Sequence, residues 1–297
     1  MKEPRKMHIE PDIDLAFIGG SGLYNLDNFN METALSIDTP YGKTSSEIIT
    51  GKMYGRNICF IPRHGKTHSL LPSEVPYAAN IWALKSIGIT KLIGVSAVGS
   101  LQKDIKPLDM VIPNQLIDNT NRRVSSFFGK GLVAHVSMSD PFCSQLSETL
   151  TTILQSENMS HHSEKTLVVI EGPQFSTYAE SHMYRKLGGH IIGMTTAQES
   201  KLAREAEICY SSIAMVTDYD CWNKNEEPVT SQIVISNLKQ NVTKVQRLIK
   251  NIVKTPVLSS DACACKDSLS NALIKDRLKL DSSLIEKLNP IVKKYIN

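Results

Sequence analysis

Ser212-Ile-Ala-Met-Val-Thr217-Asp218-Tyr219-Asp220 is the stretch that decides the fold, because an apolar run ends in it at two carboxylates spaced i, i+2. A short apolar run predicts a buried β-strand, and ligands of α/β sheets bind where such strands end. A carboxylic acid beside apolar walls can have a raised pKa and can then protonate a leaving group. The alternative interpretation is two solvated loop acids that cap the next segment. Asp218 and Asp220 are therefore candidate catalytic residues, to be judged by the rest of the chain.

Apolar runs alternate with longer segments of helical period along the chain, and this alternation predicts an α/β protein. The predicted strands cover residues 14–19, 57–61, 91–95, 110–112, 166–170, 190–193 and 211–216. We predict one helix that begins at Ser73 as its N-cap and stops at Gly88, and a second that Thr177 opens and Gly188 ends. A third helix is predicted over residues 229–252, where the apolar residues form one stripe.

The chain of 297 residues is long enough for one large α/β domain or two small ones. We predict an N-terminal extension over residues 1–12 and a main domain over 13–254. After the linker-like Lys254-Thr-Pro-Val the composition turns polar, so residues 255–297 are predicted to be a helical appendage that packs on the same domain.

Composition excludes several classes of protein. Hydrophobic residues make up 41% and charged residues 21% of the chain, which is ordinary for a globular enzyme and excludes a disordered or fibrous protein. A net charge of +3 is too small to indicate nucleic acid or a membrane surface as a partner. Because no secretory signal and no membrane span is recognisable, we expect a cytoplasmic location, with a nuclear one also compatible.

The six cysteines do not show the Cys-x-x-Cys pairs of a zinc site, so we expect free thiols and no metal. They are Cys59, Cys143, Cys209, Cys221, Cys263 and Cys265. Cys263-Ala-Cys265 is the one close pair. We interpret it as two surface thiols in a polar tail, and a redox role is the alternative.

Four polar clusters follow predicted strands, and they suit an anion. They are Gly19-Gly20-Ser21-Gly22, Arg63-His64-Gly65, Ser96-Ala97-Val98-Gly99-Ser100 and Thr195-Thr196. Backbone amides, hydroxyls and a guanidinium are the groups that hold phosphate in proteins. Each cluster alone has a plainer interpretation as a glycine turn or a surface pair. Phe175 and Met194 at the same strand ends would wall a flat heterocycle, although both are more often core residues.

Taken together, these segments carry a resemblance to a known family. Seven motifs occur in one order over residues 13–252. They are Ile18-Gly-Gly-Ser21-Gly-Leu23, Asp38-Thr-Pro-Tyr-Gly-Lys43, Arg63-His64-Gly-Lys-Thr-His68, Asn80-Ile-Trp-Ala-Leu84, Glu171-Gly-Pro-Gln-Phe-Ser176, Gly193-Met-Thr-Thr196 and Thr217-Asp-Tyr-Asp-Cys-Trp222. In this they resemble the 5′-methylthioadenosine phosphorylases of the trimeric purine nucleoside phosphorylase group. Any one of these motifs is weak evidence, but the ordered set is specific.

The resemblance implies a three-layer nucleoside phosphorylase fold, with a mixed central β-sheet flanked by helices. It implies that inorganic phosphate is a co-substrate and that no cofactor is needed. The implied phosphate ligands are Ser21, Arg63, His64, Ser96, the Ala97 amide and Thr195. The implied nucleoside ligands are Phe175, Met194, Thr217, Asp218, Asp220 and Ser231, with His135 lent by the neighbouring subunit of a homotrimer.

The chemistry of such a reaction explains these residue types. Phosphate attacks C1′ while the glycosidic bond breaks, and the ribosyl centre gains positive charge, as in glycoside cleavage generally. Adenine leaves poorly as an anion, so an acid near N7 assists its departure, and Asp218 fits this role. Asp220, as an acceptor, would favour an exocyclic amino group over a carbonyl.

Some residues depart from the family pattern, and three alternatives remain open. Ser21 and Ser96 replace threonines, which keeps the hydroxyl groups. Ser231 stands where an apolar residue is usual near the methylthio group, so adenosine is also an expected substrate. Asn121-Arg122-Arg123 matches poorly. The alternatives are a 6-oxopurine nucleoside phosphorylase, a nucleoside hydrolase of the same fold, and a non-catalytic nucleoside-binding paralogue.

Overall fold

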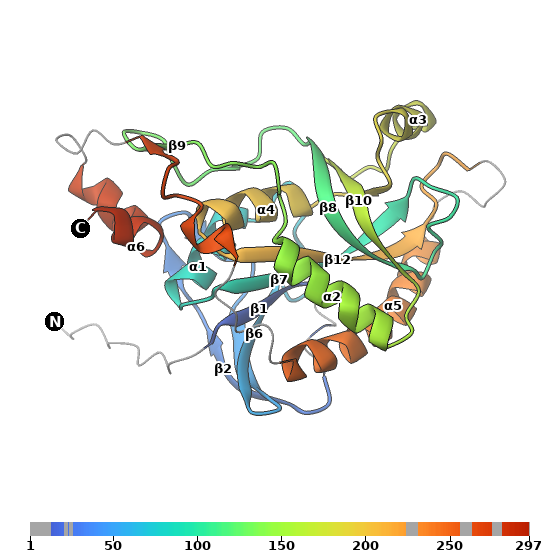
Figure 1. Cartoon of the computed structure of the whole chain (residues 1–297), viewed down its shortest axis with the longest axis horizontal. Helices are drawn as coiled ribbons and strands as arrows, with labels where there is room; N and C mark the ends of the chain where they lie inside the picture. Colours follow the sequence, from blue (N-terminus) through green and yellow to red (C-terminus); the bar gives the residue numbers. More distant parts are fainter. Residues whose placement is uncertain are drawn as a thin grey trace.

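A mixed β-sheet of nine strands forms the centre of the chain in the computed structural model, which describes residues 13–20, 23, 26–223, 231–255, 263–274 and 281–296 (Figure 1). The strands lie in the order β11 (Ile191–Gly193), β10 (His161–Ile170), β8 (Met110–Asn119), β12 (Cys209–Asp218), β7 (Lys91–Ser100), β1 (Leu15–Gly19), β6 (Arg56–Pro62), β5 (Ile48–Met53) and β2 (Phe29–Leu35). Two short sheets join β3 (Asp38–Thr39) to β4 (Gly42–Lys43) and β13 (Leu273–Ile274) to β9 (Val133–Ala134).

One half of the sheet closes on itself. β11 pairs with β10 in parallel and also with β7 in antiparallel orientation, where Ile191 lies opposite Ser100. The five strands β7, β12, β8, β10 and β11 therefore form a small barrel. The other half is open, and β6 and β1 of this half run parallel to β7 and β12 of the barrel. Because the carboxyl ends of parallel strands meet at one edge, the residues that follow these four strands are brought together.

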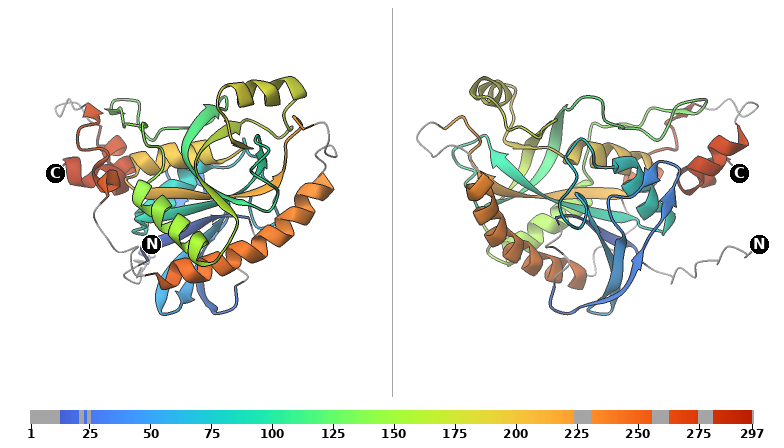
Figure 2. Two further views of the ribbon diagram at one scale, coloured as in Figure 1. Left: turned by 45° about the vertical axis from the view of Figure 1, so that its right-hand side comes forward. Right: turned by 180° about the vertical axis from the view of Figure 1, so that it is seen from behind.

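Helices cover the sheet on both faces, which confirms the predicted fold class (Figure 2). One face carries α1 (Tyr77–Ser86), α4 (Thr196–Glu205) and α6 (Ser282–Ile296), and the other carries α2 (Ser144–Ser156) and α5 (Ser231–Lys254). β1 shows why: Ala16 and Ile18 pack into the first helical layer, whereas Leu15 and Phe17 pack into the second. Burial of a side chain as large as Leu, Ile or Phe contributes roughly 1.5–3 kcal/mol. α3 (Tyr178–Lys186) stands apart, near the end of β10 (Figure 1).

All seven predicted strands are present, and β7, β8, β10 and β12 extend beyond their predicted bounds. The helix opened by Thr177 is confirmed. The Thr177 hydroxyl accepts a hydrogen bond from the Glu180 amide, and the Glu180 carboxylate accepts one from the Thr177 amide, which together form a capping box. The N-cap at Ser73 is wrong. α1 begins only at Tyr77, because Pro76, its N-cap residue, disfavours a helical conformation of the residue before it.

The described part of the tail packs on the main domain. Leu288, Ile291 and Val292 of α6 are buried, and the Trp82 indole of α1 donates a hydrogen bond of 2.9 Å to the Lys287 carbonyl. The 3₁₀ helix η2 (Ala264–Asp267) precedes β13. No helix in the described part of the chain has the length and hydropathy that a membrane crossing requires.

Candidate active site

Backbone and side-chain hydrogen bonds join the ends of four strands at the predicted site. The Arg63 amide after β6 donates to the Gly19 carbonyl of β1 at 2.9 Å. Thr217 at the end of β12 lies 3.2 Å from the Val98 carbonyl of β7. Ser21, the first predicted phosphate ligand, lies outside the described residues. The remaining strand-end residues lie at one edge of the sheet, as the sequence predicts.

Arg63 is fully enclosed and forms an ion pair with Glu199 of α4. Its Nε donates to one carboxylate oxygen and its Nη2 donates to the other at 3.0 Å. The hydroxyl of Tyr210 donates to the same carboxylate at 2.7 Å. Burial works against the charge of Arg63, but the adjacent Glu199 carboxylate outweighs it and raises the pKa of the guanidinium. Sequence reasoning missed Glu199, although a buried strand-end arginine requires a carboxylate partner.

Two further bonds leave Arg63 with little spare donor capacity. Nη1 donates to the Val95 carbonyl at 2.9 Å, and Nη2 donates to the Ile18 carbonyl at 3.2 Å. A guanidinium has five N–H groups, so one of them remains for an anion. Gly94 makes room for this arrangement, because a Cβ there would lie 2.4 Å from the Tyr210 hydroxyl oxygen. The main role of Arg63 in this structure is to organise the strand ends.

His64 is held as a neutral donor and acceptor. Its Nδ1 lies 2.8 Å from the Leu70 carbonyl, so this nitrogen carries the proton. Burial, and then the positive charge of Arg63, lower the pKa of His64 to about 4. At neutral pH Nε2 is therefore an acceptor, which suits the hydroxyl of a partly protonated phosphate and not a bare oxyanion.

Hydroxyl groups without partners lie on the phosphate side of the site. Ser96 on β7 is buried, and its Oγ has no hydrogen-bond partner among the described residues. Thr195 is the N-cap residue of α4 and is also buried, yet its side chain makes no capping bond. Ala97 follows Ser96 and is half-buried. Free hydroxyls beside the amides of a helix N-terminus form an anion-binding arrangement, since the helix dipole favours negative charge there.

Asp218 is a partly desolvated carboxyl at the end of β12. The Thr217 hydroxyl donates to its Oδ2 at 2.7 Å, and the Asp220 amide donates to its Oδ1 at 2.8 Å. Burial raises the pKa of Asp218 in spite of these two bonds. Gly99 permits the close approach of β7, because a Cβ there would lie 2.9 Å from Oδ1. A carboxyl with a raised pKa in a fixed orientation suits a general acid.

Asp220 follows with its side chain buried. Burial raises its pKa to about 6, and the negative charge of Asp218 contributes to the shift. Its Oδ2 has no partner among the described residues, so an acceptor is left for a ligand. Asp220 has a left-handed backbone conformation with φ of 51°, which aspartate tolerates better than most residues.

Phe175 and Met194 come from two segments that touch. Gly172 lies against Met194, because a Cβ at Gly172 would be 2.5 Å from the methionine sulfur. The Cys221 thiol donates to the Ser176 carbonyl at 3.2 Å, which joins the Asp220 turn to the loop that carries Phe175. Phe175 itself is 49% exposed, so its ring is available to a ligand and is not a core residue.

Arg123 is the functional residue that the sequence hid most completely. Its segment matches the family pattern poorly, yet its side chain is only 2% exposed. Nη1 donates to the Met194 carbonyl at 2.6 Å, and Nε donates to a Glu171 carboxylate oxygen at 3.0 Å. Arg123 therefore fixes the loop of Phe175 to the segment of Met194. The sequence alone does not indicate this role, because Arg123 is a basic residue in a segment that matches the family pattern poorly.

Two predicted substrate ligands, His135 and Ser231, stay predictions. His135 is exposed, and its amide donates to the Ala272 carbonyl of the tail at 2.9 Å. Ser231 is the first residue of α5, and its side chain lies outside the described ones. The helix behind it is fixed to the site, because Asn237 donates to the Thr217 carbonyl at 2.7 Å.

Comparisons with known proteins show which family the chain is similar to. Residues 14–254 match the model of the phosphorylase superfamily. The S-methyl-5′-thioadenosine phosphorylase of Synechocystis is 43% identical over 98% of this chain and 90% of its own length, and that of Thermofilum pendens is 46% identical over 88% and 99%.

Solved structures extend the likeness. A methylthioadenosine phosphorylase from an Antarctic soil metagenomic library has a TM-score of 0.90 and 45% identity, covering 94% of this chain and 99% of its own. A methylthioadenosine phosphorylase from Schistosoma mansoni in complex with adenine has a TM-score of 0.83 and 33% identity, covering 88% and 99%. Another Schistosoma mansoni structure, of a mutant bound to methylthioadenosine, is named an adenosine/methylthioadenosine phosphorylase.

Proposed function

This chain belongs to the phosphorylase superfamily, and we propose that it cleaves 5′-methylthioadenosine with phosphate to give adenine and 5-methylthioribose 1-phosphate. Relatives and structural neighbours bearing that name cover nearly the whole chain. The observation that carries the proposal is the pair of buried carboxyls, Asp218 and Asp220, one of which has an unpartnered oxygen. A 6-aminopurine offers both a nitrogen to protonate and an amino group to bind.

The proposed site has one set of groups for the attacking phosphate and another for the departing base. Phosphate lies against the Ser96 and Thr195 hydroxyls, with the remaining Arg63 N–H and neutral His64 beside it. It stabilises the positive charge that develops at C1′ and then forms the new bond. Asp218 supplies a proton near N7 as adenine departs. The Asp220 carboxylate accepts from the exocyclic amino group and disfavours a 6-oxo group, which would bring two acceptors together.

Adenosine is a second candidate substrate. The structural neighbour from Schistosoma mansoni carries adenosine in its name, and Ser231 begins the helix that follows the site. A hydroxyl near the 5′ end of the ribose accepts a 5′-OH at little cost, whereas an apolar residue does not.

The test of the proposed function is release of adenine from methylthioadenosine in dialysed protein, with and without phosphate. We expect cleavage that depends on phosphate and yields the sugar 1-phosphate. Equal hydrolysis in phosphate-free buffer would indicate a nucleoside hydrolase instead. Faster cleavage of inosine than of adenosine would indicate a 6-oxopurine enzyme, and binding without turnover would indicate a non-catalytic paralogue.

Adenine affinity should rise with pH through about 6, because the ionised Asp220 is the stronger acceptor and its pKa is about 6. The adenine affinity should increase by up to tenfold between about pH 5 and pH 8, which corresponds to a decrease of the Asp220 pKa by one unit, or 1.36 kcal/mol, when adenine binds. If adenine bound mainly through the proton of Asp218, its affinity would fall as the pH rises. The sign of the pH dependence therefore identifies which carboxyl group dominates binding. Calorimetric titration of adenine provides the measurement. Asp220→Asn should abolish the slope, and an unaltered slope in this variant would exclude Asp220 as the reader.

We also propose that the active assembly is a homotrimer in which His135 approaches a neighbour's ribose. The support is the exposure of His135 on a segment that the tail braces through Ala272. Analytical ultracentrifugation combined with the phosphorolysis assay tests this proposal. A fully active monomer would contradict an active site shared between subunits.

A further inference from the structure

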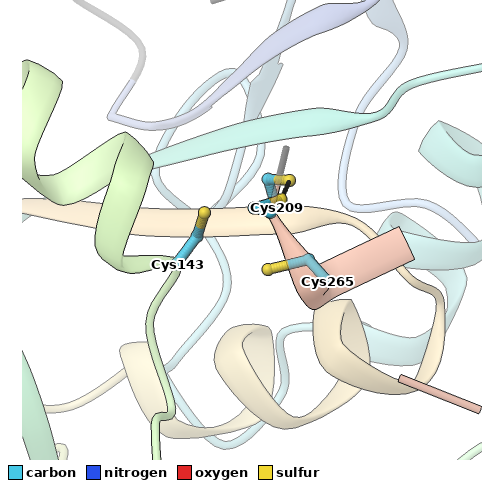
Figure 3. A group of neighbouring side chains, drawn as sticks. Cys143, Cys209 and Cys265 are labelled. Atoms are coloured by element: carbon cyan, nitrogen blue, oxygen red, sulfur yellow. Dashed lines mark hydrogen bonds between the residues drawn. The ribbon is translucent and has the colours of Figure 1, made fainter. Parts of the chain in front are cut away.

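Four cysteines that lie far apart in the sequence meet at one place outside the active site. This four-cysteine cluster consists of Cys143, Cys209, Cys263 and Cys265, whose sulfur atoms all lie within 4.8 Å of one another. Figure 3 shows three of them, coming from the start of α2, from β12 and from η2. The expectation that the tail pair is two surface thiols is therefore wrong, because Cys265 is buried and Cys263 is half-buried.

The sulfurs are close enough together to bind a single tetrahedral ion after a small movement of one pair. Four thiolates at about 2.3 Å from Zn²⁺ place their sulfurs about 3.8 Å apart. The sulfurs of Cys209 and Cys263 are 3.0 Å apart, so they would have to separate by about 0.8 Å to fit such an ion. An iron–sulfur cluster distributes its four thiolates over two or four irons, and this requires some of the sulfurs to lie farther apart than 4.8 Å. Four sulfur ligands in tetrahedral arrangement favour zinc among the single ions.

Groups that can offset negative charge lie beside the cluster. Cys143 is the N-cap residue of α2, where the helix dipole stabilises negative charge. The Arg204 guanidinium donates to the Cys265 sulfur at 3.7 Å, and the charge of Lys85 acts on Cys209. A tetrathiolate zinc site carries two negative charges, and these groups offset them.

We propose that the four-cysteine cluster binds one structural Zn²⁺ ion. Binding replaces four thiol protons, which pass to solvent, so it needs neither oxidant nor reductant. The ion ties the tail to α2 and β12. Nine residues after Cys263, Ala272 accepts the His135 amide, and β13 pairs with β9 directly before His135. The site thus fixes the segment that presents His135.

The full chain, produced with zinc in the medium and purified under reductant, is the material for the test. Elemental analysis should give one zinc per chain that survives dialysis against EDTA and is released by a mercurial thiol reagent. Replacement by Co²⁺ should give the intense visible bands and thiolate charge-transfer absorption of a tetrahedral sulfur site.

Matched variants locate the metal. Cys265→Ser should lose the zinc, whereas Cys59→Ser should retain it, because Cys59 is a buried free thiol on β6 outside the cluster. Cys263→Ser tests the same point at a less buried position. If these variants fail to fold, the cobalt spectrum of the unaltered chain still decides.

Three results would overturn the proposal. The first is a chain without metal whose six thiols all react after unfolding. The second is a disulfide within the cluster, found by mass spectrometry in spite of the reductant. The third is a cobalt spectrum typical of nitrogen and oxygen ligands.

Discussion

Asp218→Asn should lower kcat for phosphorolysis of methylthioadenosine by about 10²–10⁴-fold, the usual contribution of a general acid. The Thr217 hydroxyl, which donates to one oxygen of Asp218, keeps the Val98 carbonyl as an acceptor. An Asn side chain can still accept from the Asp220 amide through its one oxygen. It has no proton to give to adenine as the glycosidic bond breaks. The substrate KM should change little, because this interaction develops in the transition state.

The leaving group offers a control for this assignment. A nucleoside whose base departs readily without protonation should be cleaved by the variant nearly as fast as by the original chain. Asp104→Asn, at an exposed aspartate, controls for the loss of a charge. Unchanged turnover of methylthioadenosine in Asp218→Asn would show that another group protonates the base.

Glu199→Ala should lower the free energy of unfolding by about 3–5 kcal/mol, because it leaves the buried Arg63 charge without its partner. It also removes the acceptor of the Tyr210 hydroxyl. The effect is large because both side chains of the ion pair are almost wholly enclosed, at 3% and 0% exposed. Urea denaturation measures it, and a loss below about 1 kcal/mol would mean that water solvates the arginine.

A triple variant separates stability from phosphate binding. Arg63→Met, Glu199→Leu and Tyr210→Phe together leave no buried charge or unpaired hydroxyl, and such replacements are often neutral or stabilising. Stability should therefore return. The KM for phosphate should be roughly 10- to 100-fold higher than in the original chain, because the variant lacks the Arg63 hydrogen bond to phosphate. One hydrogen bond to a charged group is worth about 1.5–3 kcal/mol. A normal phosphate KM in this variant would show that Arg63 is only structural.

The sequence predicted the main strands, and the strand-end positions of the candidate site residues, because both depend on local patterns. Apolar runs mark β1, β6 and β12, and polar residues such as Ser96 and Asp218 follow directly after or within the predicted runs. The edge strand β2 and its neighbour β5 were missed, and β2 is largely exposed and has no apolar run. The closure of the barrel by β11 and β7 depends on contacts between residues nearly one hundred positions apart.

Partners that come from distant segments could not be read from spacing. Glu199 and Arg63 are 136 positions apart, and Arg123 meets Glu171 across 48. The four-cysteine cluster is the clearest case, because Cys143 and Cys265 belong to segments with no shared motif. Only the fold brings such residues together, and no local rule on ligand spacing applies to them.

The central position of β7 has a consequence for synthesis on the ribosome. β7 pairs with β1 before it in the chain, but also with β11 and β12, which are translated about one hundred residues later. A nascent chain that ends before residue 199 therefore contains Arg63 without Glu199, and its barrel is open. Folding of this enzyme is completed only after β12 has left the exit tunnel, and until then an unpaired strand edge is exposed to chaperones and to aggregation.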